Sequence, residues 1–140
     1  MPVLQKGVAA LSKKMPKVIS PKAHAIADYA TIATFALLAG LFWSRHQRAA
    51  ISALFCAGAE LTTTLLTDFP GGAARLITLP THVKMDFGLA AVASAMPTFL
   101  DFEDDPEARW FRLLGLNLTA VAAMTDTGEL RPQYRRPRAA

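Results

Sequence analysis

The segments HAIADY (residues 24–29) and HVKMDF (residues 82–87) each place a histidine and an aspartate one helical turn apart. The two histidines are separated by 58 residues, and so are the two aspartates. Each pair stands at the start of a long apolar stretch, where burying ionisable groups is costly unless they are paired. This recurrence of polar residues in apolar surroundings indicates two copies of one structural unit.

The doublet Thr-Asp recurs with the same separation, at residues 67–68 and 125–126. Each copy therefore reads H-x-x-x-D, then about 40 residues, then T-D, and it contains two apolar stretches. A unit with two helices returns to the side on which it began. The two copies are thus expected to share one orientation and to be related by a pseudo-two-fold axis along the bundle.

Four long apolar stretches determine the predicted fold class. The chain has 140 residues, of which 52% are hydrophobic and 19% charged, and few charges interrupt residues 26–43, 49–67, 85–100 and 110–125. Helices of this length reach roughly 24 to 28 Å, and one more turn each spans a hydrocarbon core of about 30 Å. We expect an all-α, four-helix transmembrane bundle made of two tandem two-helix repeats. A soluble bundle is the alternative, because the spans are short.

The chain divides into four predicted segments. Residues 1–20 form an amphipathic interfacial helix, 21–77 the first hairpin repeat, 78–128 the second, and 129–140 a basic disordered tail. In the first segment apolar residues lie on one helical stripe and lysines mostly on the opposite side, which is typical of a helix on an anionic membrane surface. An ordinary amphipathic helix packed on the protein is the alternative.

The distribution of positive charge predicts the orientation. Most of the 15 Lys and Arg fall on the side that holds both termini, so both termini should face the cytoplasm of a bacterium, with the helices in its inner membrane. Trp43 and Trp110 lie at the far helix ends, as interface anchors do. No apolar core with a cleavage site follows the first lysines, so we expect no cleaved signal peptide. The expected partners are anionic lipid headgroups and a larger membrane complex or a homo-oligomer. Nucleic acid is not expected, because the basic termini lack interleaved stacking aromatics.

Six polar residues should converge in one layer near the cytoplasmic surface. They are His24, Asp28, Asp68, His82, Asp86 and Asp126. Histidine and aspartate at i and i+4 share one helix face, close enough to bind one ion or two adjacent ions, and mixed nitrogen and oxygen ligands favour zinc, iron or manganese. Carboxylate-bridged di-metal bundles have a similar ligand count, but they use Glu three residues before His.

Two other interpretations of this layer remain open. The six groups can form a hydrogen-bonded network that fixes helix ends, since carboxylates are favoured near helix N-termini. Asp68 and Asp126 fit that role less well, because they follow helix C-termini and need a cationic partner. A haem held by His24 and His82 is the third interpretation, although Asp28 and Asp86 would then lie against a largely apolar macrocycle.

Glu60 and Asn117 are the other polar residues at membrane depth. An acid at that depth costs several kcal/mol unless it is neutral or paired. A neutral Glu60 hydrogen-bonded to Asn117 or Thr63 would join two helices. A proton or ion path along the face of Glu60 and Thr64 is the functional alternative.

These observations lead to two functional hypotheses. The first is a small integral membrane protein that binds a metal ion or cofactor in the His/Asp layer near the cytoplasmic face. The second is a non-catalytic accessory subunit of a larger membrane complex, whose Ala- and Gly-rich helices pack against its partners. The sequence contains no nucleophile-base triad, phosphate loop or dinucleotide fingerprint. It therefore assigns no catalytic residue and leaves open whether the protein is an enzyme.

Overall fold

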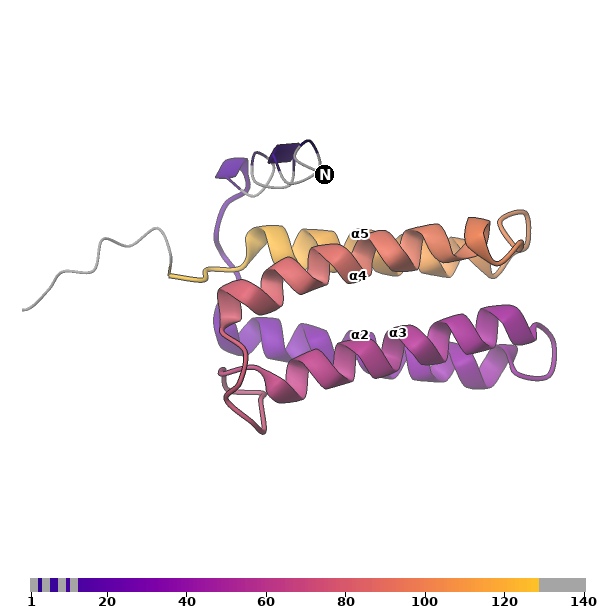
Figure 1. Ribbon diagram of the computed structural model, residues 1–140, viewed down its shortest axis with the longest axis horizontal. Coiled ribbons are helices and arrows are strands. Elements are labelled where there is room, and N and C mark those ends of the chain that lie inside the picture. Colours follow the sequence, from indigo (N-terminus) through magenta and orange to yellow (C-terminus); the bar gives the residue numbers. More distant parts are fainter. Residues whose placement is uncertain (1–2, 4–5, 8–9, 11–12, 129–140) are drawn as a thin grey trace, which may run out of the picture.

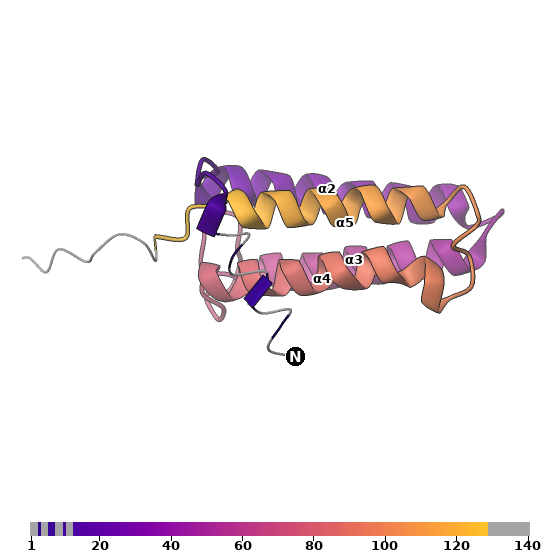
Figure 2. The same cartoon turned by 90° about the horizontal axis from the view of Figure 1, so that it is seen from above.

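The computed structural model describes residue 3, residues 6–7, residue 10 and residues 13–128. It contains four long helices, which are α2 (Pro21–Phe42), α3 (Gln47–Leu66), α4 (Leu79–Phe99) and α5 (Ala108–Met124). Figure 1 shows the helices as antiparallel neighbours in an elongated bundle, and Figure 2 shows the same bundle from above. The prediction of an all-α, four-helix fold is confirmed.

The helices pack as two hairpins. Helix α2 packs along α3 and helix α4 along α5, and the hairpins meet through α3 with α4 and α2 with α5. Helices α2 and α4 are therefore diagonal across the bundle axis. Their N-terminal ends lie at the same end of the bundle (Figure 1), which we call the polar end because it holds the His/Asp pairs.

The first helix of each hairpin begins with the same cap. The Ser20 hydroxyl accepts a hydrogen bond from the Ala23 N–H, and the Thr78 hydroxyl accepts one from the Thr81 N–H. A proline follows each cap within the first turn, where its missing N–H is not needed. Because the caps lie 58 residues apart, they start α2 and α4 in the same register relative to their histidines.

Two short backbone bridges close the polar end. Ile19 pairs with Thr125, and Ile77 pairs with Thr67, each in parallel orientation and again 58 residues apart. Each bridge is framed by backbone hydrogen bonds of 2.8 to 3.0 Å. The end of α5 is thereby fixed to the start of α2, and the end of α3 to the start of α4. These bridges place a threonine beside each histidine.

The apolar core fills the bundle away from the polar end. Phe35, Phe102 and Phe111 are fully buried there among small residues, mainly alanines. The small residues let the helices approach closely. At Gly115 a Cβ atom would lie 2.1 Å from the Ser94 Oγ and 2.9 Å from the Ala90 carbonyl oxygen, so α4 and α5 are in contact along their backbones.

Large apolar side chains also cover much of the bundle's outer surface. Those more than half exposed on the helices include Leu37, Leu41, Ile51, Leu54, Phe55, Leu113 and Leu116. Helices α2 and α3 are long and apolar enough to cross a membrane by length and composition, which is a weak indication because core helices of soluble proteins pass the same test. The transmembrane assignment therefore stays a prediction.

The N-terminal segment is described only in part. Residues 13 and 14 are helical, Met15 lies in a bend, and the chain then runs to the start of α2 without helix, as expected around Pro16. Much of the predicted interfacial helix, and the predicted tail at residues 129–140, lie outside the described residues.

Candidate metal centre

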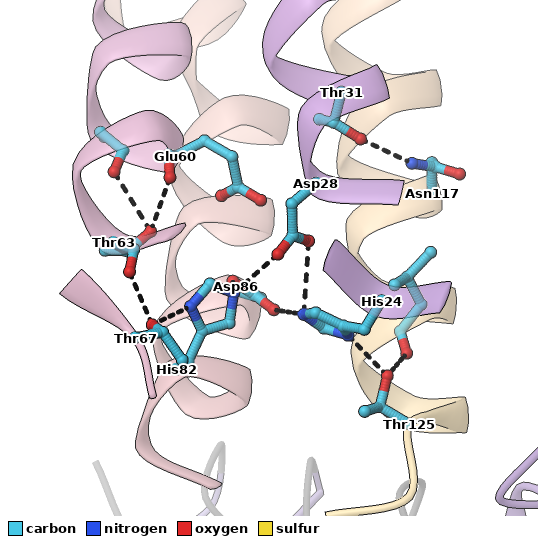
Figure 3. Close-up of polar contacts among 12 residues, drawn as sticks. His24, Asp28, Thr31, Glu60, Thr63, Thr67, His82, Asp86, Asn117 and Thr125 are labelled. Atoms are coloured by element: carbon cyan, nitrogen blue, oxygen red, sulfur yellow. Dashed lines mark hydrogen bonds and ion pairs between the residues drawn. The ribbon is translucent and has the colours of Figure 1, made fainter. Parts of the chain in front are cut away.

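Two histidines and two aspartates meet on the axis of the bundle at its polar end (Figure 3). His24 and Asp28 come from α2, and His82 and Asp86 come from the diagonal helix α4. All four side chains are buried, with exposed fractions of 0 to 2%. Each offers a ligand atom that lies within 4.8 Å of the other three, so the group can hold a metal ion. The i, i+4 spacing explains why each pair projects from one face of its helix.

The four side chains form a closed ring of contacts. The His24 Nε2 lies 3.3 Å from the Asp28 Oδ1 and 3.1 Å from the Asp86 Oδ2. The His82 Nε2 lies 3.2 Å from the Asp28 Oδ2 and 3.2 Å from the Asp86 Oδ1. Each carboxylate thus uses both of its oxygens and bridges the two imidazoles. The ring repeats the 58-residue correspondence of the sequence.

A threonine fixes the tautomer of each histidine. The Thr125 hydroxyl donates to the Val121 carbonyl at 2.6 Å, and its oxygen lies 2.7 Å from the His24 Nδ1. The hydroxyl proton is used by the carbonyl, so the Thr125 oxygen must accept from an Nδ1–H group. Thr67 repeats this arrangement with His82, at 2.7 Å. In a neutral imidazole the Nε2 lone pair then points into the ring of carboxylates.

That arrangement is unfavourable without a positive charge at the centre. The Nε2 atoms of His24 and His82 are buried and make no hydrogen bond, and one oxygen of each aspartate is in the same position. Lone pairs of nitrogen facing carboxylate oxygens repel each other, and the low polarity of the interior does not screen them. Either a metal ion lies among these atoms, or both imidazoles carry a second proton.

The distances distinguish the two solutions. Charge-assisted N–H···O bonds are typically about 2.7 to 2.9 Å long, and the partly exposed pair of His46 and Asp105 meets that value at 2.8 Å. The ring contacts of 3.1 to 3.3 Å are longer, and each Nε2 is shared between two oxygens. Neighbouring ligands around a tetrahedral ion with bonds of about 2.0 to 2.1 Å lie roughly 3.3 Å apart. The ring geometry is therefore closer to a coordination shell than to hydrogen-bonded ion pairs.

Two of the six predicted ligands lie outside this group. The Asp68 carboxylate is 57% exposed and lies 3.4 Å from the Arg75 Nε. Asp126 is partly exposed, and its carboxylate accepts a hydrogen bond from the Gly128 N–H. In each Thr-Asp doublet the threonine points inward and the aspartate outward. The recurrence of the doublet identified the right segment, but the sequence analysis assigned the contact to the wrong member of the pair.

The geometry does not suit a haem between His24 and His82. Their ring centroids are 5.1 Å apart, and both aspartates contact both Nε2 atoms. Carboxylates therefore occupy the space in which a macrocycle would lie.

Glu60 and Asn117 do not bond to each other. The Asn117 amide donates to the Thr31 hydroxyl at 3.2 Å (Figure 3). The Thr63 hydroxyl donates to the backbone carbonyl of Glu60 at 3.0 Å rather than to its carboxyl group. Glu60 is fully buried, and neither of its carboxyl oxygens has a hydrogen-bond partner. The expected bonds of Glu60 to Asn117 or Thr63 are thus corrected, and its carboxyl group stays unpaired beside the ring.

Phe69 covers the ring at the polar end, a role that the sequence analysis missed. Its aromatic ring lies 6.2 Å from that of His24 and 5.4 Å from that of His82, measured between centroids. The Tyr29 hydroxyl holds the surrounding loop against α2 by donating to the Gly71 carbonyl at 2.6 Å. The only available sequence signal was an aromatic residue within the helix-breaking segment DFPGG (residues 68–72).

Comparison of the chain with known protein families, with curated proteins and with solved structures finds no match. The chemistry of the site is accordingly argued from its own residues: a buried His24/Asp28/His82/Asp86 cluster that can hold a metal ion.

Proposed function

We propose that this protein is a small integral membrane protein that binds one divalent transition-metal ion between His24, Asp28, His82 and Asp86, near the cytoplasmic face. One observation carries the proposal. Two threonines turn both Nε2 lone pairs toward the same buried pair of carboxylates, an arrangement that a shared cation stabilises. Ligating histidines characteristically donate their other ring N–H to a fixed acceptor, which sets the tautomer and the ring orientation.

Charge and ligand type support a divalent transition metal. Two carboxylates and two neutral imidazoles carry a charge of −2, which one divalent ion neutralises. Two nitrogen and two or more oxygen donors suit zinc, iron(II) or manganese(II), whereas calcium prefers oxygen alone and copper(I) prefers sulfur. The centroid separation of 5.1 Å between the imidazoles favours one shared ion. Two ions about 3.5 to 4 Å apart would hold the rings further from each other.

The membrane location rests on the surface and the charges. Exposed leucine, isoleucine and phenylalanine side chains surround the helices, and α2 and α3 are long enough to span a bilayer. A bundle whose helices are apolar on all sides is more stable in lipid than in water. The excess of Lys and Arg at the polar end places that end, with both termini, at the anionic cytoplasmic surface of a bacterial inner membrane.

Elemental analysis of the protein purified in detergent tests this function. We expect one zinc, iron or manganese ion per chain, and loss of that ion in His82→Ala. His46→Ala is the matched control, because His46 lies outside the ring and pairs with Asp105. A metal-free protein that gains no stability when these ions are added would refute the metal site and leave the doubly protonated histidine network.

An accessory-subunit role is the second candidate. The outer face of α3 has a shallow groove lined by Leu54, Phe55, Gly58, Ala59, Thr62 and Thr63. Small residues at such a position let another helix approach closely in a membrane. Native mass spectrometry from mild detergent tests this role, which predicts a larger complex or a homo-oligomer that Gly58→Leu disrupts. A monomer under all mild conditions would contradict it.

A further inference from the structure

The ring is nearly symmetric, but its surroundings are not. Glu60 and Thr64 of α3 correspond, 58 residues later, to Leu118 and Ala122 of α5. All four side chains are buried, with exposed fractions of 0 to 2%. Only the α3 side of the ring therefore carries a buried carboxyl group and a buried hydroxyl group.

These two groups have unused hydrogen-bonding capacity. Both carboxyl oxygens of Glu60 and the hydroxyl of Thr64 lack a partner. Other helical threonines, such as Thr62 and Thr119, donate to the carbonyl four residues earlier. Leaving three such buried atoms without partners costs about 1 to 3 kcal/mol for each hydrogen-bonding group, so their retention points to a ligand.

The position of Glu60 indicates the size of that ligand. Its carboxyl group points across the bundle toward Asp28 (Figure 3), and Thr64 lies one turn further along the same helix face. Glu60 is not among the four residues whose ligand atoms lie within 4.8 Å of one another. It is therefore too distant to join the same coordination shell directly in this geometry, and a small molecule can bridge it to the ring.

We propose that Glu60 and Thr64 hold one water molecule as an additional, exchangeable ligand of the metal ion on the α3 side. This inference rests on the proposed metal centre. The water oxygen binds the ion, donates a hydrogen bond to the Glu60 carboxylate and accepts one from the Thr64 hydroxyl, which gives the roughly three bonds typical of buried water. Metal centres that keep such a position can bind and activate small oxygen ligands, whereas closed structural sites cannot.

Pulsed electron paramagnetic resonance of the manganese(II)-loaded protein tests this position. In water enriched in the magnetic oxygen isotope, a directly bound water gives an oxygen hyperfine coupling. We expect the coupling in the wild-type protein. The double variant Glu60→Leu with Thr64→Ala copies the residues of α5, and it should lose the coupling while still binding one manganese ion per chain.

The outcomes separate this inference from the metal centre itself. An equal coupling in the double variant, or manganese binding without any coupling in the wild type, would overturn the water position and leave the metal centre intact. Failure of the wild type to bind manganese, zinc or iron would overturn both. If the double variant does not fold, Thr64→Ala alone should weaken the coupling, and Glu60→Gln, which keeps an oxygen acceptor, should retain it; the opposite pattern would refute the role of these residues.

Discussion

The Nδ1 of His24 lies 2.7 Å from the hydroxyl oxygen of Thr125, which is 101 residues away in the chain. This bond joins the first turn of α2 to the end of α5 and decides which nitrogen of His24 faces Asp28 and Asp86. The corresponding bond of His82 to Thr67, also 2.7 Å, does the same from the other side. The orientation of both putatively ligating nitrogens thus depends on residues that touch no ion themselves.

Replacing Thr125 should weaken metal binding without removing a ligand. In Thr125→Val the side-chain shape is kept but the acceptor of the His24 Nδ1–H is lost. Outer-shell substitutions of this type typically cost about 10- to 100-fold in metal affinity. Competition with a chromophoric chelator measures the change. Thr119→Val is the control, because the Thr119 hydroxyl bonds only to the Gly115 carbonyl in the described structure; equal affinities in all three proteins would contradict the orienting role.

Metal removal should destabilise the protein more than it destabilises a ring variant. An ion present at about 100 times its dissociation constant stabilises the folded state by about 2.7 kcal/mol. Chelation should therefore lower the thermal unfolding temperature of the wild type and leave that of Asp86→Asn, which has lost a charged ligand, almost unchanged. A chelator effect of the same size in both proteins would show that the ion binds elsewhere.

Metal affinity should fall as the pH is lowered. Protons compete with the ion for the imidazole nitrogens and carboxylate oxygens of the ring, so binding releases protons where these groups are protonated in the free protein. Titration of the same protein at several pH values, with the proton release measured in weakly buffered solution, checks this. A network of doubly protonated histidines predicts the reverse, namely that the metal-free protein itself becomes most stable at low pH.

Phe69→Ala should accelerate the exchange of the ion. Phe69 covers both imidazoles, and its removal opens the polar end without changing any ligand. We expect faster transfer of the ion to a chelator, with a smaller change in equilibrium affinity. Phe55→Ala is the control, because Phe55 lies exposed on the outer face of α3. Identical transfer rates for wild type and Phe69→Ala would rule out the covering role.

Gly115→Ala should destabilise the bundle. The added Cβ would lie 2.1 Å from the Ser94 Oγ and 2.9 Å from the Ala90 carbonyl oxygen, so α4 and α5 must separate. Overpacking of this kind costs about 1 to 3 kcal/mol. Gly88→Ala meets nothing within 4 Å and should be neutral or slightly stabilising. Unfolding in detergent measures both, and equal stability of the two variants would be inconsistent with close contact of α4 and α5.

The helices and half of the site's logic were predictable from the sequence. The apolar stretches and the proline-containing starts located four helices, because the period and the breakers act locally. His24, Asp28, His82 and Asp86 were identifiable because i, i+4 spacing fixes a shared face within one helix. Their diagonal placement across the axis followed from the short connections between successive helices.

The remaining contacts depend on tertiary packing. Whether Thr125 or Asp126 faces the ring is determined by the backbone bridge to Ile19, which rotates the chain as α5 ends. No local pattern encodes that rotation. The expected pairing of Glu60 with Asn117 failed for a similar reason, since similar depth along two helices does not establish that their side chains face each other. Phe69 lies in an irregular loop, where periodicity gives no information.

X-ray absorption at the metal edge, recorded on the protein purified from its host membranes, tests the central claim most directly. The ring predicts a first shell of nitrogen and oxygen at about 2.0 to 2.2 Å, with the outer-shell scattering of two imidazoles, which falls to one imidazole in His82→Ala. Absence of a bound zinc, iron or manganese ion, or an ion whose spectrum contains no imidazole scattering, would contradict a metal centre between α2 and α4.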